Sequence, residues 1–180
     1  MQARISPAIP PFPSEVQAAL DRLLRGAPPL ILFTTLARDP RLFGKFFAGG
    51  LLDRGNLTLR QRELVIDRTT ALCGSEYEWG AHVAIFGERA GIDRAQAASL
   101  ARGGPDDSCW SDADRDVLRF CDALHRDCTI DDALWQRLAE QFSDAAMIEL
   151  LMLAGFYRTV SYLTNALRLP LESGAARFPA

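Results

Sequence analysis

The chain has 180 residues, a length that fits one domain, or one domain with an arm, and that can bury most of its apolar surface. Its hydrophobic fraction of 48% and charged fraction of 24% are those of an ordinary soluble globular protein. The net charge of −3 excludes the basic footprint of a protein that binds nucleic acid or an anionic membrane surface. The partners we expect are therefore a small-molecule substrate and other copies of the chain.

The N-terminal segment predicts an extended arm. Residues 1–13 contain four prolines, which fix φ and remove backbone donors, so no helix or strand is expected there. The segment also has no apolar run of signal-peptide length, which argues against a secretion signal. We therefore divide the chain into a proline-rich arm, residues 1–13, and a single helical domain, residues 14–180.

The cysteines and the apolar runs favour a cytoplasmic location. The four cysteines form no CxxC pair, and no histidine is spaced to complete a zinc site, so we expect reduced thiols. The longest uncharged apolar stretch near the C-terminus runs only from Leu150 to Tyr157, and we therefore expect no helix that spans a bilayer.

Helical spacing and capping signals predict an all-α domain of about eight or nine helices. Ser14 with Gln17 has the pattern of a capping box that opens the first helix, and Gly26 ends it. No segment alternates with period two for long enough to be a strand, and the chain has no internal repeat. The later helices are expected over residues 30–38, 41–52, 59–72 and 75–91. Four more are expected to begin at residue 93, at residue 111, at residue 131 or 132, and at residue 143.

The last predicted helix is apolar on nearly every side. It begins after Ser143 and carries leucine, methionine, valine and aromatic residues around its whole circumference. Such a helix must be enclosed by its own domain or by another subunit. We therefore expect it to form the core or an oligomer interface.

Acids and a histidine converge between Glu63 and His82. Ser75, Glu78 and His82 lie at positions i, i+3 and i+7, so their side chains leave one face of a helix. Glu63 belongs to the preceding helix and reaches the same place only if the two helices pack together. A carboxylate beside an imidazole orients the ring and tunes its proton affinity, which indicates general acid–base chemistry.

Structural, non-catalytic interpretations of these residues stay open. Ser75 and Glu78 also match a capping box, and a lone helical histidine is often structural. Glu63, Glu78 and His82 could also hold a divalent metal, but the HExxH pattern is absent and we expect no metal.

Cys73 ends an apolar run, which is typical of buried packing, although a thiol before a helix start can become reactive. The aromatic residues Tyr77, Trp79 and Phe86 are expected in the core or in a pocket wall, and His125 on a helix surface.

The block ELVIDRTTALCGSEYEWGAH resembles the carboxymuconolactone decarboxylase family, which is similar in fold to alkylhydroperoxidase D. The proline-bearing arm and the closing segment ELLMLAGFYRTVSYLTNALRLPLE extend the resemblance over nearly the whole chain. The peroxidase branch of this family carries Glu, eleven residues, Cys-x2-Cys, three residues and His. The same spacing runs here from Glu63 to Ser75, Glu78 and His82, so the acid and the histidine remain while both thiols are replaced.

The resemblance implies an all-helical subunit that assembles into dimers, trimers or hexamers and uses no metal or organic cofactor. It predicts a cofactor-independent, lyase-type enzyme that transfers protons on a small carboxylated or carbonyl-bearing ring compound. His82 would be the general acid or base, Glu63 would orient it or relay protons, and Glu78 would be a second acid or a substrate-orienting group. The substrate-binding residues expected beside them are Ser75, Tyr77 and Trp79.

Two other functions remain open at this stage. One is an alkylhydroperoxidase-like thiol oxidoreductase that uses Cys73, although Cys73 lies two residues out of register with the family motif. The other is a non-catalytic family member in which Ser75 and Glu78 only cap the helix and the pocket binds a ligand or a partner.

Overall fold

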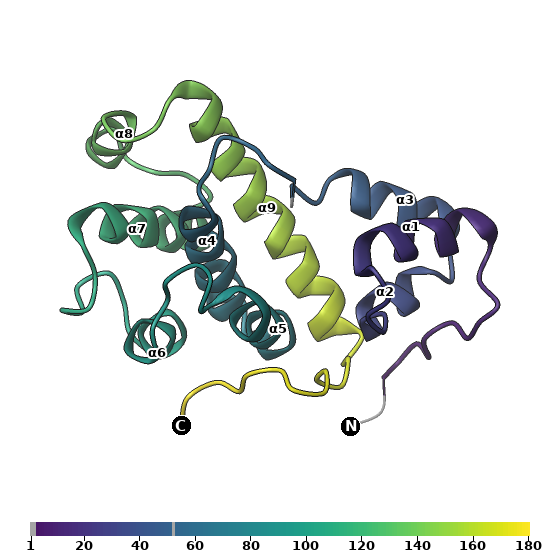
Figure 1. The fold of residues 1–180 in the computed structure, drawn as a ribbon. Coiled ribbons are helices and arrows are strands. Elements are labelled where there is room, and N and C mark those ends of the chain that lie inside the picture. The colour runs from purple at the N-terminus through teal and green to yellow at the C-terminus, as the bar shows by residue number, and fades with distance from the viewer. Residues whose placement is uncertain (1–2, 52) are drawn as a thin grey trace.

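A computed structural model describes residues 3–51 and 53–180, and over these residues the chain is all-helical, as predicted (Figure 1). Residues 1–2 of the expected arm and Leu52 of the expected third helix lie outside the described residues. The helices are α1 (Ser14–Leu24), α2 (Ile31–Leu36), α3 (Pro40–Ala48), α4 (Leu59–Leu72), α5 (Glu76–Phe86), α6 (Arg94–Arg102), α7 (Asp112–Asp127), α8 (Asp132–Ala139) and α9 (Asp144–Ala166).

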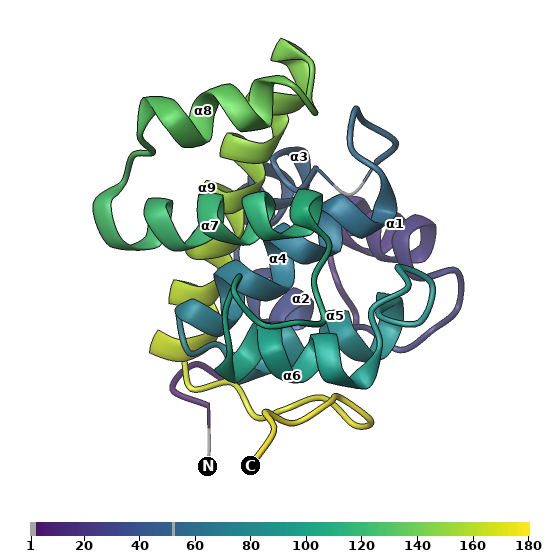
Figure 2. The same ribbon diagram turned by 90° about the vertical axis from the view of Figure 1, so that its left-hand side faces the viewer.

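The long helix α9 runs between two groups of helices. Figure 1 shows α1, α2 and α3 on one side of α9 and α4 to α8 on the other, and Figure 2 shows α7 lying across α4. The main apolar core is built largely from α4 to α9. A smaller cluster joins α1 to α3 through Val16, Leu20, Ala37 and Phe43. The segment from Glu63 to His82 therefore lies in the larger group.

Helix α4 is the centre of that group and packs against α5, α6, α7 and α9. Its start is fixed by the predicted capping box: Thr58 accepts a hydrogen bond from the Gln61 backbone, and the Gln61 side chain accepts one from the Thr58 backbone. Every side chain from position 63 to position 70 is buried. Gly74 follows with φ +65°, a conformation that glycine adopts without steric cost, and this turn brings α5 back against α4.

Several predicted helix ends differ from the observed ones. The N-cap of α1 is Pro13, because Ser14 is already helical and makes no capping bond. Helix α3 stops at Ala48, before two glycines, rather than at residue 52. Helix α5 ends at Phe86 instead of Gly91, since glycine at the next position favours an ending and the chain continues as turns to Gly91.

Helix α9 corrects the expectation that no helix could span a bilayer. Its 23 residues are long and apolar enough for a membrane crossing, by length and composition alone. The expectation was wrong because it considered only the uncharged stretch and not the whole helix. A core helix passes the same test, and α9 packs against α4, α5 and α8. Its other face exposes Ile148, Met152 and Tyr162.

The C-terminal tail passes along α5 and α6 (Figures 1 and 2). The Ala176 amide donates to the Gly80 carbonyl at 3.0 Å, and the Phe178 ring lies 5.1 Å from the Trp79 ring. A β-carbon at Gly80 would collide with the Ala176 carbonyl oxygen, so the tail can approach α5 only at a glycine. Helix α5 is thus held between α4 and the tail.

Candidate active site

Glu63 of α4 and His82 of α5 meet in the interior. The imidazole Nδ1 donates to Glu63 Oε2 at 2.8 Å. Glu63 is fully buried and His82 is 6% exposed. The two helices therefore pack as the sequence argument required, and the acid orients the imidazole through a direct hydrogen bond.

The other imidazole nitrogen faces two further groups. Nε2 of His82 lies 3.4 Å from Glu78 Oε1, one turn earlier on α5, and 3.2 Å from the hydroxyl of Tyr157 on α9. The Tyr157 and His82 rings also pack edge to face, with their centroids 5.1 Å apart. Three helices thus fix the orientation of one imidazole, and we call Glu63, Glu78, His82 and Tyr157 the His82 cluster.

The charges of this cluster favour an imidazolium. Burial alone lowers the pKa of His82, but hydrogen bonds and charge interactions with Glu63 and Glu78 outweigh it and raise the pKa to about 10. Burial, and then the nearby acids, raises the pKa of Tyr157 well above its ordinary value, so this phenol stays neutral. At neutral pH both imidazole nitrogens therefore carry protons, and Nε2–H is a potential proton donor.

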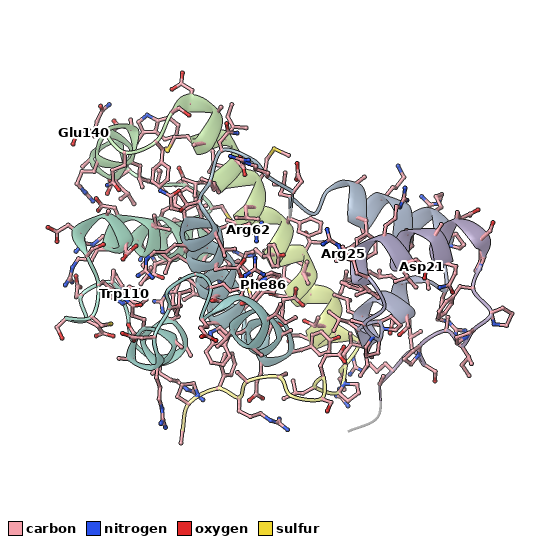
Figure 3. All side chains as sticks on the ribbon, viewed as in Figure 1. Asp21, Arg25, Arg62, Phe86, Trp110 and Glu140 are labelled. Carbon is pink, nitrogen blue, oxygen red and sulfur yellow. The ribbon has the colours of Figure 1, made fainter. Side chains whose placement is uncertain are left out.

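Arg62 and Phe86, both labelled in Figure 3, lie against residues of the cluster. Arg62 Nε lies 3.2 Å from Glu63 Oε1, and its guanidinium carbon lies 5.7 Å from the centre of the Phe86 ring. The Phe86 ring in turn lies 5.3 Å from the His82 ring. Five surface cavities are formed by other described residues, and Glu63, Glu78 and His82 line none of these five. The imidazole is thus almost closed off in this conformation.

The predicted substrate-binding residues make contacts away from the His82 imidazole. Ser75 Oγ caps α5 by accepting from the Glu78 backbone, and it bonds to the Thr164 hydroxyl at 2.8 Å. The Tyr77 hydroxyl accepts from a backbone amide of α2 and donates to Glu172 in the C-terminal tail. Trp79 is buried under the tail. These contacts stabilise α5 and its surroundings, and roles in substrate binding remain predictions.

Cys73 lies at the C-terminus of α4, outside the His82 cluster. It is half-buried, and its Sγ is 3.9 Å from Nδ1 of His125. Burial raises the pKa of its thiol despite the nearby Arg158. His125 is therefore more than a surface residue, because it packs against a thiol. Among residues 3–51 and 53–180, no three His, Cys, Asp or Glu side chains are arranged to hold a metal ion.

Sequence reasoning missed two residues at this site. Tyr157 comes from α9 and lies 75 positions from His82, so no local spacing connects them. Asp67 lies one turn after Glu63 on α4, and that i, i+4 spacing was a usable signal. Asp67 is fully buried, and neither of its carboxyl oxygens has a hydrogen-bond partner.

Comparison with known proteins agrees with this fold. Residues 40–123 match the profile of the carboxymuconolactone decarboxylase family. The chain matches none of the curated proteins with which it was compared.

Solved structures with the same fold cover nearly the whole chain. A peroxidase-related protein of Ralstonia eutropha JMP134 with an alkylhydroperoxidase AhpD core is 21% identical, with a TM-score of 0.79 over 96% of this chain and 95% of that one. A peroxidase-related protein of Silicibacter sp. TM1040 is 19% identical, with a TM-score of 0.75 over 96% and 95%. The debrominase Bmp8, in complex with 2,3,4-tribromopyrrole, is 16% identical, with a TM-score of 0.73 over 97% and 94%. Residues 40–123 thus belong to the carboxymuconolactone decarboxylase family, and the described chain has the alkylhydroperoxidase D-like fold.

Proposed function

We propose that this chain is a cofactor-independent enzyme that transfers a proton to or from a small ring compound bearing a carboxylate or carbonyl group. The observation that supports this proposal is the buried imidazole, bonded to Glu63 through Nδ1 and directed toward Glu78 and Tyr157 through Nε2. A positioned acid or base of this kind typically contributes about 10²- to 10⁴-fold to a rate.

The roles follow from the two nitrogens of His82. Loss of CO2 from an activated lactone leaves a delocalised carbanion, and the Nε2–H bond of the imidazolium supplies the proton that this carbon needs. Glu63 stabilises the charged ring from the opposite nitrogen and fixes its orientation. Glu78 and Tyr157 lie beside Nε2, where they orient the substrate or accept the hydrogen bond before it binds.

A substrate must displace the cover of the site before it reaches Nε2. Arg62 and Phe86 are the side chains whose movement would uncover the imidazole, because they lie against Glu63 and His82. A guanidinium at the entrance also suits a carboxylated substrate, since arginine binds carboxylates with two parallel hydrogen bonds. The debrominase of the same fold holds a small substituted ring, which is compatible in size with this substrate class.

The two alternatives differ from this proposal in measurable ways. A thiol oxidoreductase using Cys73 has less support, because burial raises the pKa of that thiol and the His82 cluster does not contact it. A non-catalytic ligand-binding protein would keep the same fold with no turnover. The nearly closed surroundings of His82 are the feature that this alternative explains most simply.

The test is a panel of carboxylated lactones and β-keto acids, followed by CO2 release and by deuterium uptake from solvent at carbon. We expect turnover by the natural protein, a loss of at least about 10²-fold in His82→Gln, and no loss in His125→Gln. His125 is the matched control because it is the second of the two histidines and lies outside the His82 cluster. Full turnover by His82→Gln would remove the mechanism.

A further inference from the structure

One of the five cavities lies where the end of α9, the start of α5 and the C-terminal tail meet (Figure 1). Its volume is about 450 Å³, within the range of about 300–1,000 Å³ that is usual for small-molecule sites. No residue of the His82 cluster lines it. The proposed function therefore leaves this cavity without a role, and we call it the tail cavity.

The tail cavity is lined by two guanidinium groups whose donors are almost unused. Arg168, directly after α9, makes no side-chain hydrogen bond or ion pair with the rest of the described chain. Arg177, in the tail, lies 4.0 Å from Glu76 Oε2, which is beyond hydrogen-bond distance. Each guanidinium carries five N–H donors, so this lining offers many donors to a ligand.

The acids at the tail cavity are bound by the protein itself. Glu76, the acid on its described lining, accepts from the Phe178 amide at 3.0 Å through Oε1 and faces Arg177 through Oε2. Glu172, next to the lining, accepts from the Tyr77 hydroxyl and from a backbone amide of α2. Two cations against one acid give the described lining an excess of positive charge, which favours an anion.

Much of the remaining lining is apolar. Leu169, Pro170 and Leu171 line the cavity from the tail, and Tyr77 lines it from α5. Gly74 also lines it, and a β-carbon at this position would meet no other atom within 4 Å. The cavity thus has room beside the glycine, and its lining suits a ligand with an anionic end and an apolar body.

We propose that the tail cavity binds a small organic carboxylate with an apolar body, and that Arg168 and Arg177 hold its carboxylate. Arginine binds carboxylates through two parallel hydrogen bonds. Both side chains are exposed, so their guanidinium groups can turn toward the same ligand. This inference goes beyond the proposed function and does not rest on it, because the cavity contains none of the residues that transfer the proton.

The backbone at Arg168 provides a variant that removes the guanidinium without straining the fold. Arg168 has φ +53°, a left-handed conformation that glycine adopts without steric cost, so Arg168→Gly should fold. Arg25 is the matched control, since it is also an exposed arginine directly after a helix, with φ +49°. It lines none of the five cavities.

Calorimetric titration of the full chain with phenylacetate tests the proposal. We expect saturable binding, at least about tenfold weaker binding of phenylacetamide, which lacks the charge, and similarly weak binding of inorganic phosphate, which lacks the apolar body. Arg168→Gly and Arg177→Gln should each weaken the binding of phenylacetate by at least about tenfold, whereas Arg25→Gly should not change it.

Several results would overturn the proposal. They are no saturable binding of phenylacetate, equal binding of phenylacetamide or phosphate, and binding that Arg168→Gly or Arg177→Gln leaves unchanged. The last result would also identify phenylacetate bound at the His82 cluster instead, since neither arginine belongs to that cluster.

Limited proteolysis supplies a second measurement. Trypsin cleaves after arginine, and a carboxylate held by Arg177 should slow cleavage between Arg177 and Phe178. Cleavage after Arg25 should keep its rate, and peptide mass spectrometry distinguishes the two sites. An unchanged rate at Arg177 with saturating phenylacetate would overturn the proposal.

These outcomes separate the two proposals. A protein that binds phenylacetate through both arginines but shows no turnover would defeat the proposed function alone. A protein with His82-dependent turnover but without this binding would defeat the tail-cavity proposal alone.

Discussion

Replacement of His82 by glutamine should change how the stability of the protein depends on pH. The pKa of His82 is about 10 in the folded state, against an ordinary value of 6.5. The folded protein therefore binds this proton more tightly than the unfolded chain does. The resulting stabilisation is complete below a pH of about 6.5 and is lost as the pH rises through about 10.

The size of this effect follows from the difference between the two pKa values. One pKa unit corresponds to about 1.4 kcal/mol, so the stabilisation has a ceiling of about 5 kcal/mol. We expect a measured loss of about 2–4 kcal/mol, because Glu63 and Glu78 share the interaction and partly reorganise. At a pH of about 6.5, His82→Gln should itself destabilise the protein by about 3–5 kcal/mol, since it removes the cation from a buried pair.

The assay is urea unfolding followed by circular dichroism at several pH values between about 6 and 10, at constant ionic strength. The natural protein should lose up to about 1.4 kcal/mol per pH unit more than His82→Gln over this range, whereas His125→Gln should follow the natural protein. Equal slopes for the natural protein and His82→Gln would refute the reasoning, because the imidazole would then have the same proton affinity in both states.

Three further predictions concern other parts of the molecule. Asp67→Asn should stabilise the protein at neutral pH by about 1–3 kcal/mol, because Asp67 is neutral in the folded protein and ionised in the unfolded chain. The gain should vanish near a pH of about 4, where the unfolded chain also takes up this proton, and urea unfolding at both pH values checks it. Gly80→Ala should destabilise the fold by about 1–3 kcal/mol because its β-carbon collides with the tail, while Gly44→Ala, in open space on a helix, should not, as thermal unfolding would show. Iodoacetamide should alkylate the exposed Cys128 first and spare Cys121 until unfolding, because burial raises the pKa of Cys121 to about 12; peptide mass spectrometry reads the order.

Structural features were predicted most accurately from the sequence where the signal is local. Both ends of α4 were predicted correctly because Thr58 and Gln61 cap its start and Gly74 ends it within a few residues. The packing of Glu63 against His82 could be stated as a requirement from helical spacing. The distance between the Glu63 carboxylate and the His82 imidazole could not be derived, because it depends on how two helices approach each other.

Other features depend on contacts between distant segments. Tyr157 joins the site from α9, and no spacing in the central block indicates it. The contacts of Tyr77 with Glu172 likewise require the C-terminal tail to lie against α5. Asp67 could have been noticed as an acid one turn after Glu63. That it lacks a hydrogen-bond partner, however, is known only when all its neighbours are placed.

The burial of α4 has a consequence for engineering. Glu63, Asp67 and Arg68 are buried where α4 packs against four other helices, so a substitution there changes the stability of the whole domain together with the chemistry. Libraries aimed at new substrates should therefore vary Arg62 and Phe86, which lie at the margin of the site, and leave the inner wall untouched. The natural diversification of this chemistry is expected to follow the same division between a fixed interior and a variable entrance.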